Sequence, residues 1–87
     1  MNPATLDLRV TVLDNWDEVT LHLPSATQVV ELKRAALSRA GIRGLPADYV
    51  VKYKGAELAE AGRTLADSGV APNSALLVLR RRRVPVR

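Results

Sequence analysis

The chain has 87 residues and a formal net charge of +4, and it contains no cysteine and no phenylalanine. This length allows one domain with a modest, largely aliphatic core. The missing cysteines exclude disulfides, thiolate catalysis and sulfur-ligated metal sites. No apolar run approaches the roughly 20 residues that cross a bilayer, and the N-terminus lacks the pattern of a signal peptide, so we expect a soluble, cytoplasmic protein.

Two segments near the N-terminus have the pattern of strands. Residues 6–13 alternate apolar and polar side chains, which is the period of a half-buried strand. Turn-forming residues interrupt this pattern at 14–18, and the alternation resumes over 19–23 until Pro24. We expect a hairpin with the apolar side chains of both strands on one face.

A helix is predicted after the hairpin. Ser25 and Gln28 have the spacing of a capping box, which predicts a helix start at this point. Apolar residues then recur at helical spacing over 29–40, and Gly41 is a suitable residue to end the helix.

The second half of the chain predicts two more strands joined by an irregular crossover. Residues 49–54 form the third strand, 56–73 contain turns with scattered apolar anchors, and 75–79 form a last strand that extends into arginines. The predicted fold is α+β, a β-grasp in which one helix packs across one face of a mixed four- to five-stranded sheet. We expect a single domain over 1–83 and a short tail over 84–87.

Three segments carry a resemblance to the ubiquitin family over nearly the whole chain. They are 53–58, 62–67 with the pattern Gly-Arg-Thr-Leu-x-Asp, and 74–80, at the spacing that the family shows. In that family a C-terminal Gly-Gly is activated and joined to lysine. Here Val84 and Pro85 fall on those two positions and no glycine follows Gly69, so we do not expect a protein modifier or a sulfur carrier.

The resemblance also implies a recognition surface on the outer face of the sheet. The isoleucine at the centre of the family's patch falls on Lys52, its histidine on Leu77 and its valine on Leu79. Val50, Leu77 and Leu79 are expected to form a small exposed apolar area edged by Lys52, Lys54 and the outward-facing arginines that follow, suited to a partner with apolar and acidic groups. Ordinary exposure of a sheet face and a homodimer contact are the alternatives for this area.

Bacterial ubiquitin-like proteins of the YukD kind, which accompany type VII secretion systems, also lack the Gly-Gly tail. Arginine greatly outnumbers lysine and alanine is abundant, a bias expected of a bacterial genome rich in G and C. The resemblance to this subgroup rests on size and architecture, and it implies a non-covalent accessory role.

The residues offer no constellation for catalysis or metal binding. His22 is the one histidine, and it falls on the polar side of its predicted strand without a nucleophile to assist. Asp14, Asp17 and Glu18 lack the glycine and terminal glutamate of a calcium loop. We therefore expect neither an enzyme nor a cofactor.

Two further features suggest binding. Trp16 lies at the predicted hairpin tip, either as an interface anchor or folded back over the strand edge. The basic run that follows the last strand is expected to make electrostatic contacts through Arg80, Arg81, Arg82 and Arg83. We favour a non-catalytic protein-interaction module, monomeric or weakly dimeric, over the alternative of nucleic-acid or polyanion binding, because no aromatic side chains are interleaved with these arginines.

Overall fold

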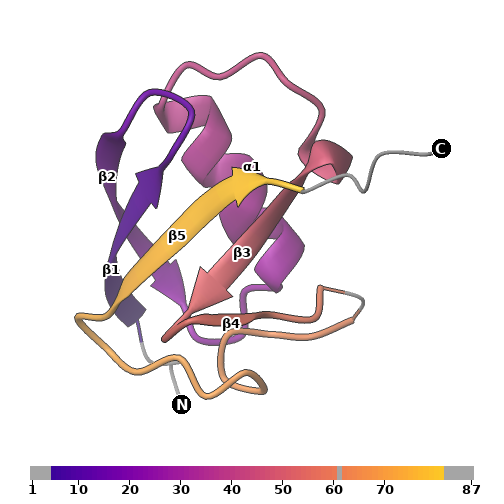
Figure 1. Cartoon of the computed structure of the whole chain (residues 1–87). Helices are drawn as coiled ribbons and strands as arrows, with labels where there is room; N and C mark the ends of the chain where they lie inside the picture. Colours follow the sequence, from indigo (N-terminus) through magenta and orange to yellow (C-terminus); the bar gives the residue numbers. More distant parts are fainter. Residues whose placement is uncertain (1–4, 61, 82–87) are drawn as a thin grey trace, which may run out of the picture.

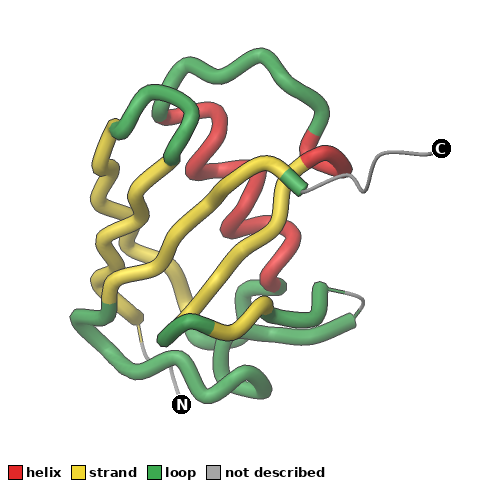
Figure 2. Tube along the Cα trace, in the orientation of Figure 1, coloured by secondary structure: helices red, strands yellow, loops and turns green. Residues whose placement is uncertain are grey.

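The computed structural model describes residues 5–60 and 62–81. Figures 1 and 2 show a twisted sheet with one long helix behind it. The elements in chain order are β1 (Thr5–Val12), β2 (Asp17–Pro24), α1 (Val29–Arg39), the 3-10 turn η1 (Pro46–Asp48), β3 (Tyr49–Tyr53), β4 (Ala56–Glu57) and β5 (Ala75–Arg80). The strand order in the sheet is β2-β1-β5-β3-β4.

The predicted hairpin is present. β1 and β2 pair antiparallel in one unbroken register from Thr5 opposite Pro24 to Val12 opposite Asp17. The apolar residues of both strands face the core, with Val19 and Leu21 buried and Leu23 partly buried against them. The alternation of side chains in the sequence therefore sets which face of the hairpin is covered.

The helix starts later than the capping box predicts. Gln28 is the N-cap residue and its side chain makes no capping hydrogen bond, so the prediction of a capping box at Ser25 is wrong. The main-chain oxygen of Ser25 instead accepts a hydrogen bond from the amide of Ala66, and Gln28 forms an isolated bridge with Thr64. The crossover segment thus holds residues 25–28 outside the helix. Gly41 ends the helix as predicted, with a φ of 74°.

The last strand lies in the middle of the sheet. β5 pairs parallel with β1 and antiparallel with β3. Because β1 and β5 are the two ends of the described chain, their pairing closes the fold through contacts between residues far apart in sequence.

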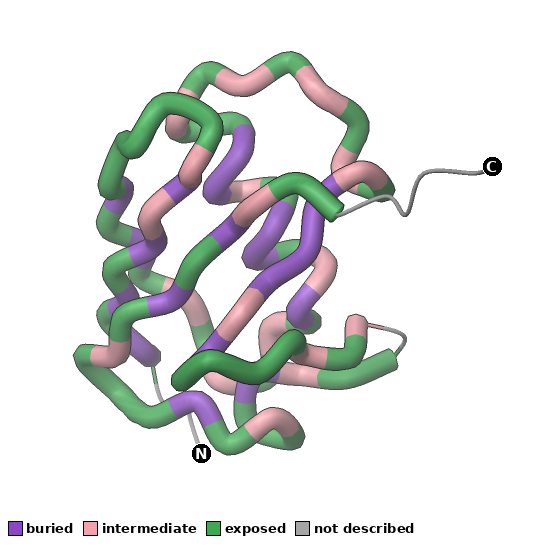
Figure 3. The backbone as a smooth tube through the Cα atoms, viewed as in Figure 1, coloured by how far each residue is buried: buried purple, intermediate pink, exposed green. Residues whose placement is uncertain are grey.

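The core lies between the sheet and α1. Its apolar residues come from every long strand, from the inner side of α1 and from Leu65 and Val70 of the crossover. In Figure 3 buried and exposed residues alternate along β5, which shows that one face of the sheet is covered and the other is open. The open face is where side chains are available to a partner.

Candidate functional site: the open face of the sheet

The strand register determines which side chains are neighbours on the open face. Leu77 on β5 lies between Thr11 on β1 and Lys52 on β3. One step along the strands, Leu79 lies opposite Val50. The structure therefore brings together four of the predicted contact residues, and we call Val50, Lys52, Leu77 and Leu79 the open-face patch.

The exposure of these residues differs from the prediction in one respect. Leu77 is 41% exposed, whereas Val50 is 5% exposed, so the prediction of Val50 as part of an exposed apolar area is wrong. Val50 lines a shallow hollow together with longer side chains, which leave little of it accessible. The hollow is lined by Val50, Lys52, Glu57, Leu79, Arg80 and Arg81. Leu77 is thus the main apolar contact that the patch offers, with Leu79 half-buried beside it.

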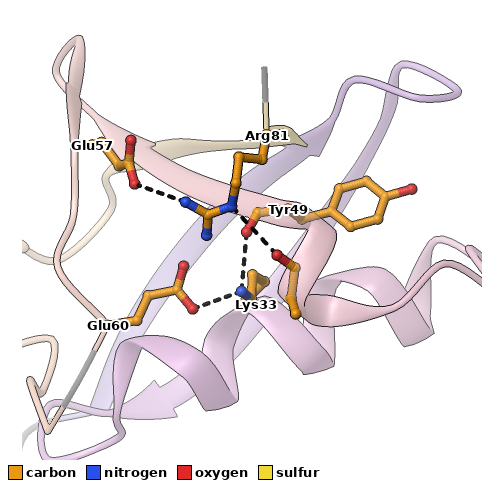
Figure 4. Close-up of polar contacts among 6 residues, drawn as sticks. Lys33, Tyr49, Glu57, Glu60 and Arg81 are labelled. Carbon is orange, nitrogen blue, oxygen red and sulfur yellow. Dashed lines mark hydrogen bonds and ion pairs between the residues drawn. The ribbon is translucent and has the colours of Figure 1, made fainter. Parts of the chain in front are cut away.

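Arg81 borders the hollow and is held by three contacts, of which that with Glu57 is labelled in Figure 4. Its amide donates to the main-chain oxygen of Asp48 at 2.7 Å, and its Nε donates to that of Ala47 at 3.4 Å. Its guanidinium lies 3.9 Å from a carboxylate oxygen of Glu57. The chain beyond β5 is therefore attached to η1 and to β4, and the Arg81 guanidinium lies beside the Glu57 carboxylate at the edge of the patch.

Arg80 belongs to a second cluster at the same end of the sheet. Its Nε lies 3.4 Å from Oδ2 of Asp14, and its guanidinium lies 5.4 Å from the centre of the Tyr49 ring. The Tyr49 hydroxyl donates to the same oxygen of Asp14 at 2.5 Å. This hydrogen bond raises the pKa of Tyr49 above its ordinary value, and burial of the ring contributes a smaller increase. Asp14 therefore joins the hairpin loop to the ends of β3 and β5.

The ring of Tyr49 also accounts for a glycine in the loop before η1. A Cβ added to Gly44 would lie 2.8 Å from Cε1 and from the hydroxyl oxygen of Tyr49. Gly44 is thus required by close packing against the ring.

A buried ion pair lies behind the sheet. Lys33 of α1 is 2% exposed, and its Nζ lies 2.6 Å from Oε1 of Glu60. The same Nζ donates to the main-chain oxygen of Tyr49 at 3.0 Å. Figure 4 shows Lys33 reaching from the helix to both partners. The charge links α1, β3 and the crossover loop, and it is structural because it is not accessible from the open face.

Two predicted contact residues lie away from the patch. Lys54 follows β3 at the end opposite Arg80, where its Nζ lies 5.4 Å from the centre of the Tyr53 ring. Trp16 is at the hairpin tip with a φ of 55° and is 74% exposed, so the alternative in which it folds back over the strand edge is wrong. Arg82 and Arg83 lie outside the described residues, as does the tail over 84–87.

The described residues contain no group of three or more metal-ligating side chains. His22 lies on the open side of β2, as predicted, with Nδ1 2.6 Å from Oδ1 of Asp7. Within the part of the chain that the structure describes, no helix is long and apolar enough to cross a membrane.

The architecture and the open face together define a ubiquitin-like β-grasp fold. Comparison with solved structures supports this: ubiquitin from Caldiarchaeum subterraneum superposes with a TM-score of 0.76 over 91% of this chain and 96% of its own, at 16% identity. A protein designed on the basis of ubiquitin gives 0.78 over 98% of this chain and 99% of its own, at 20% identity. No family model and no curated protein matches the sequence. At these identities the likeness shows the fold.

Sequence reasoning missed the role of Tyr49 and of the buried Lys33. Tyr49 contacts Asp14, which is 35 positions away, and Lys33 contacts Glu60 across a comparable separation in the chain. No local pattern marks such pairs, because each contact depends on how the elements pack. The one available signal was Lys33 itself, a charged residue next to the buried Leu32 on the helix.

Proposed function

We propose that this protein is a non-catalytic, ubiquitin-like interaction module that binds a protein partner non-covalently through the open-face patch. The observation that carries the proposal is Leu77, an exposed apolar side chain in the middle strand of the open face, beside Lys52. An apolar contact next to a cation suits a partner that presents an apolar residue with an acidic one. Arg81 and Glu57 border the same patch as a pair of opposite charges, so Lys52 is the cation that the proposal uses.

The rival function, binding of nucleic acid or another polyanion, receives less support from the arginines. Arg80 contacts Asp14 and Arg81 contacts Glu57, so each of these two cations already has an acidic neighbour. Phosphate binding would have to compete with these carboxylates. Anisotropy measurements with mixed-sequence DNA and RNA at increasing salt test the rival directly, since tight binding that falls steeply with salt would favour it.

The test of the patch uses charge reversal at its centre. We expect Leu77→Glu and Lys52→Glu each to reduce capture of partner proteins from the native organism at least about tenfold, because each places a carboxylate where an acidic partner binds. Ser38→Glu on the exposed side of α1 adds the same charge away from the patch and serves as the matched control. Circular dichroism checks that each variant is folded, and the partner is identified by mass spectrometry.

Equal capture by the wild type and by both folded patch variants would reject the site. A setting as an accessory or adaptor subunit, for example of a bacterial secretion system in the cytoplasm, stays a prediction from the sequence. The identity of the captured partner tests that setting, and a search of the same sample for covalent adducts tests the non-covalent mode.

A further inference from the structure

The outer strand β2 has a free edge. It is the first strand in the sheet order and pairs on one side with β1. Among the described residues, no main-chain hydrogen bond joins residues 18–23 to any segment other than β1. Figures 1 and 2 show β2 as the outermost strand, away from β5 and β3. The other edge of the sheet, β4, has only two residues.

This edge has few of the features that usually prevent strands from pairing between molecules, and its two charged acidic residues, Asp17 and Glu18, lie at its start. Proteins protect long edges with lysine, with internal proline, or with a bulge that bends the strand. β2 has eight residues, an unbroken register with β1, no lysine, and proline only at its last position. It therefore presents a regular row of main-chain donors and acceptors.

The side chains of β2 are complementary to themselves when a second copy is placed antiparallel around Thr20. Val19 then lies opposite Leu21 of the second copy, on the face that carries the core. On the open face, Glu18 lies opposite the second copy's His22. Because Nδ1 of His22 already lies 2.6 Å from Asp7 of its own chain, the imidazole can donate to both carboxylates only in its charged form. The two-fold axis passes between the two Thr20 residues, so each contact occurs twice.

Neighbouring registers are less favourable. A shift of one residue would place apolar side chains opposite polar ones on the wrong face. A shift of two residues in one direction places Glu18 opposite Pro24 of the second copy. A shift of two residues in the other direction places Glu18 opposite Thr20. Both shifts lose the pair between Glu18 and His22. The pair between Glu18 and His22 thus distinguishes the register around Thr20 from its neighbours.

The same register brings a second exposed residue to the interface. Trp16 immediately precedes β2 in the hairpin turn, so this register brings the turn of one copy to the end of β2 at Pro24 of the other. Trp16 is 74% exposed in the single chain, and it is the most exposed of the large apolar residues in the described part. Contact with proline would remove part of this apolar surface from water.

We propose that two copies of this chain form a symmetric dimer by antiparallel pairing of their β2 strands around Thr20. The sheet then continues from one copy into the other, and both α1 helices lie on the same side of it. The dimer uses a different surface from the open-face patch, so it does not rest on the proposed function. Either proposal can be rejected while the other stands.

The first test uses cysteine as a reporter in a chain that has none. We expect Thr20→Cys to form a disulfide-linked dimer under mild oxidation, because the two positions face each other across the axis. Ala75→Cys, exposed on the same face but on β5, is the matched control and should stay monomeric. A mixture of Glu18→Cys with His22→Cys should cross-link, whereas neither variant should do so alone. Failure of Thr20→Cys to cross-link, or equal cross-linking of Ala75→Cys, would overturn the proposal.

The second test measures the dimer without a covalent bond. In sedimentation equilibrium we expect Thr20→Lys to raise the dimer dissociation constant at least about tenfold, because two lysines then oppose each other at the axis. Ala75→Lys adds the same charge and should leave the constant unchanged. Trp16 is the single tryptophan, so its emission should shift to shorter wavelength as the wild type dimerises. A wild type that stays monomeric at all concentrations, or an equal effect of the two lysines, would reject the edge dimer.

Discussion

At the scale of single residues, Tyr49 makes contacts with four parts of the fold. Its hydroxyl donates to Asp14, its main-chain oxygen accepts from Lys33, and its ring packs against Arg80 and the backbone of Gly44. A tyrosine at this position in a strand looks ordinary in the sequence. Its importance arises because it is fully buried while its hydroxyl reaches a carboxylate.

The substitution Tyr49→Phe should therefore destabilise the protein at neutral pH by about 1–2 kcal/mol, since it removes a hydrogen bond to a charged acceptor. Urea unfolding measures this loss.

At high pH we expect Tyr49→Phe to change how steeply the free energy of unfolding falls as pH rises. Above the ordinary tyrosine pKa, near 10, the unfolded chain loses its phenolic proton while folded Tyr49, whose pKa is raised, keeps it. The wild type thus loses stability as pH rises from about 10 through the folded pKa, and Tyr49→Phe should lose less.

Tyr53 provides the control because its pKa shift has the opposite sign. Its hydroxyl contacts Ser74 Oγ at 3.2 Å and accepts a hydrogen bond from the amide of Ala71. Both hydrogen bonds lower the pKa of Tyr53, and the one with Ser74 has the larger effect. Folded Tyr53 gives up its proton before the unfolded chain does, so it opposes the alkaline loss. Tyr53→Phe should make the loss steeper. A Tyr49→Phe variant with the same alkaline slope as the wild type would contradict this assignment.

At the scale of elements, the ion pair between Lys33 and Glu60 connects the helix to the crossover loop. We expect Glu60→Ala to destabilise the protein by about 3 kcal/mol, because it leaves the charge of Lys33 buried without its carboxylate. The double variant Lys33→Met/Glu60→Ala should be more stable than Glu60→Ala alone, since it removes the buried charge as well. Urea unfolding of the three variants, including Lys33→Met, gives the coupling free energy.

The control for this pair is Glu31→Ala, which removes an exposed carboxylate 3.5 Å from Arg34 on the same helix. Exposed pairs contribute little, so its effect should stay below about 0.5 kcal/mol. If Glu60→Ala were as mild as Glu31→Ala, the buried pair would not stabilise the contact between α1 and the crossover.

At the scale of the whole molecule, the described residues share one core between the sheet and α1. Thermal unfolding at concentrations where the chain is monomeric should be a single two-state transition, with a heat-capacity change of about 1.2 kcal/mol/K for 87 residues. Calorimetry tests this through the ratio of the calorimetric to the van't Hoff enthalpy, which should be close to unity. Two separate transitions would contradict a single cooperative unit.

The sequence by itself determined the order of the four long strands and the helix, and the core-facing side of β1 and β2, but neither η1 nor β4. Alternation over 6–13 and 19–23 specifies the hairpin because a pleated strand has a period of two, and Gly41 marks the helix end because a left-handed residue is needed there. The helix start was predicted wrongly at Ser25, since hydrogen bonds from the distant crossover hold that segment outside the helix.

Only the tertiary structure decided how the surface is arranged. It buried Val50 while leaving Leu77 exposed, and it placed Lys54 Nζ over the Tyr53 ring and Trp16 in the hairpin turn. It also brought Asp14 to Tyr49 and Lys33 to Glu60, and it left β2 as a free edge. Local periodicity determines which face of a strand is apolar, but exposure and pairing depend on neighbours from distant parts of the chain, which only the packed fold brings together.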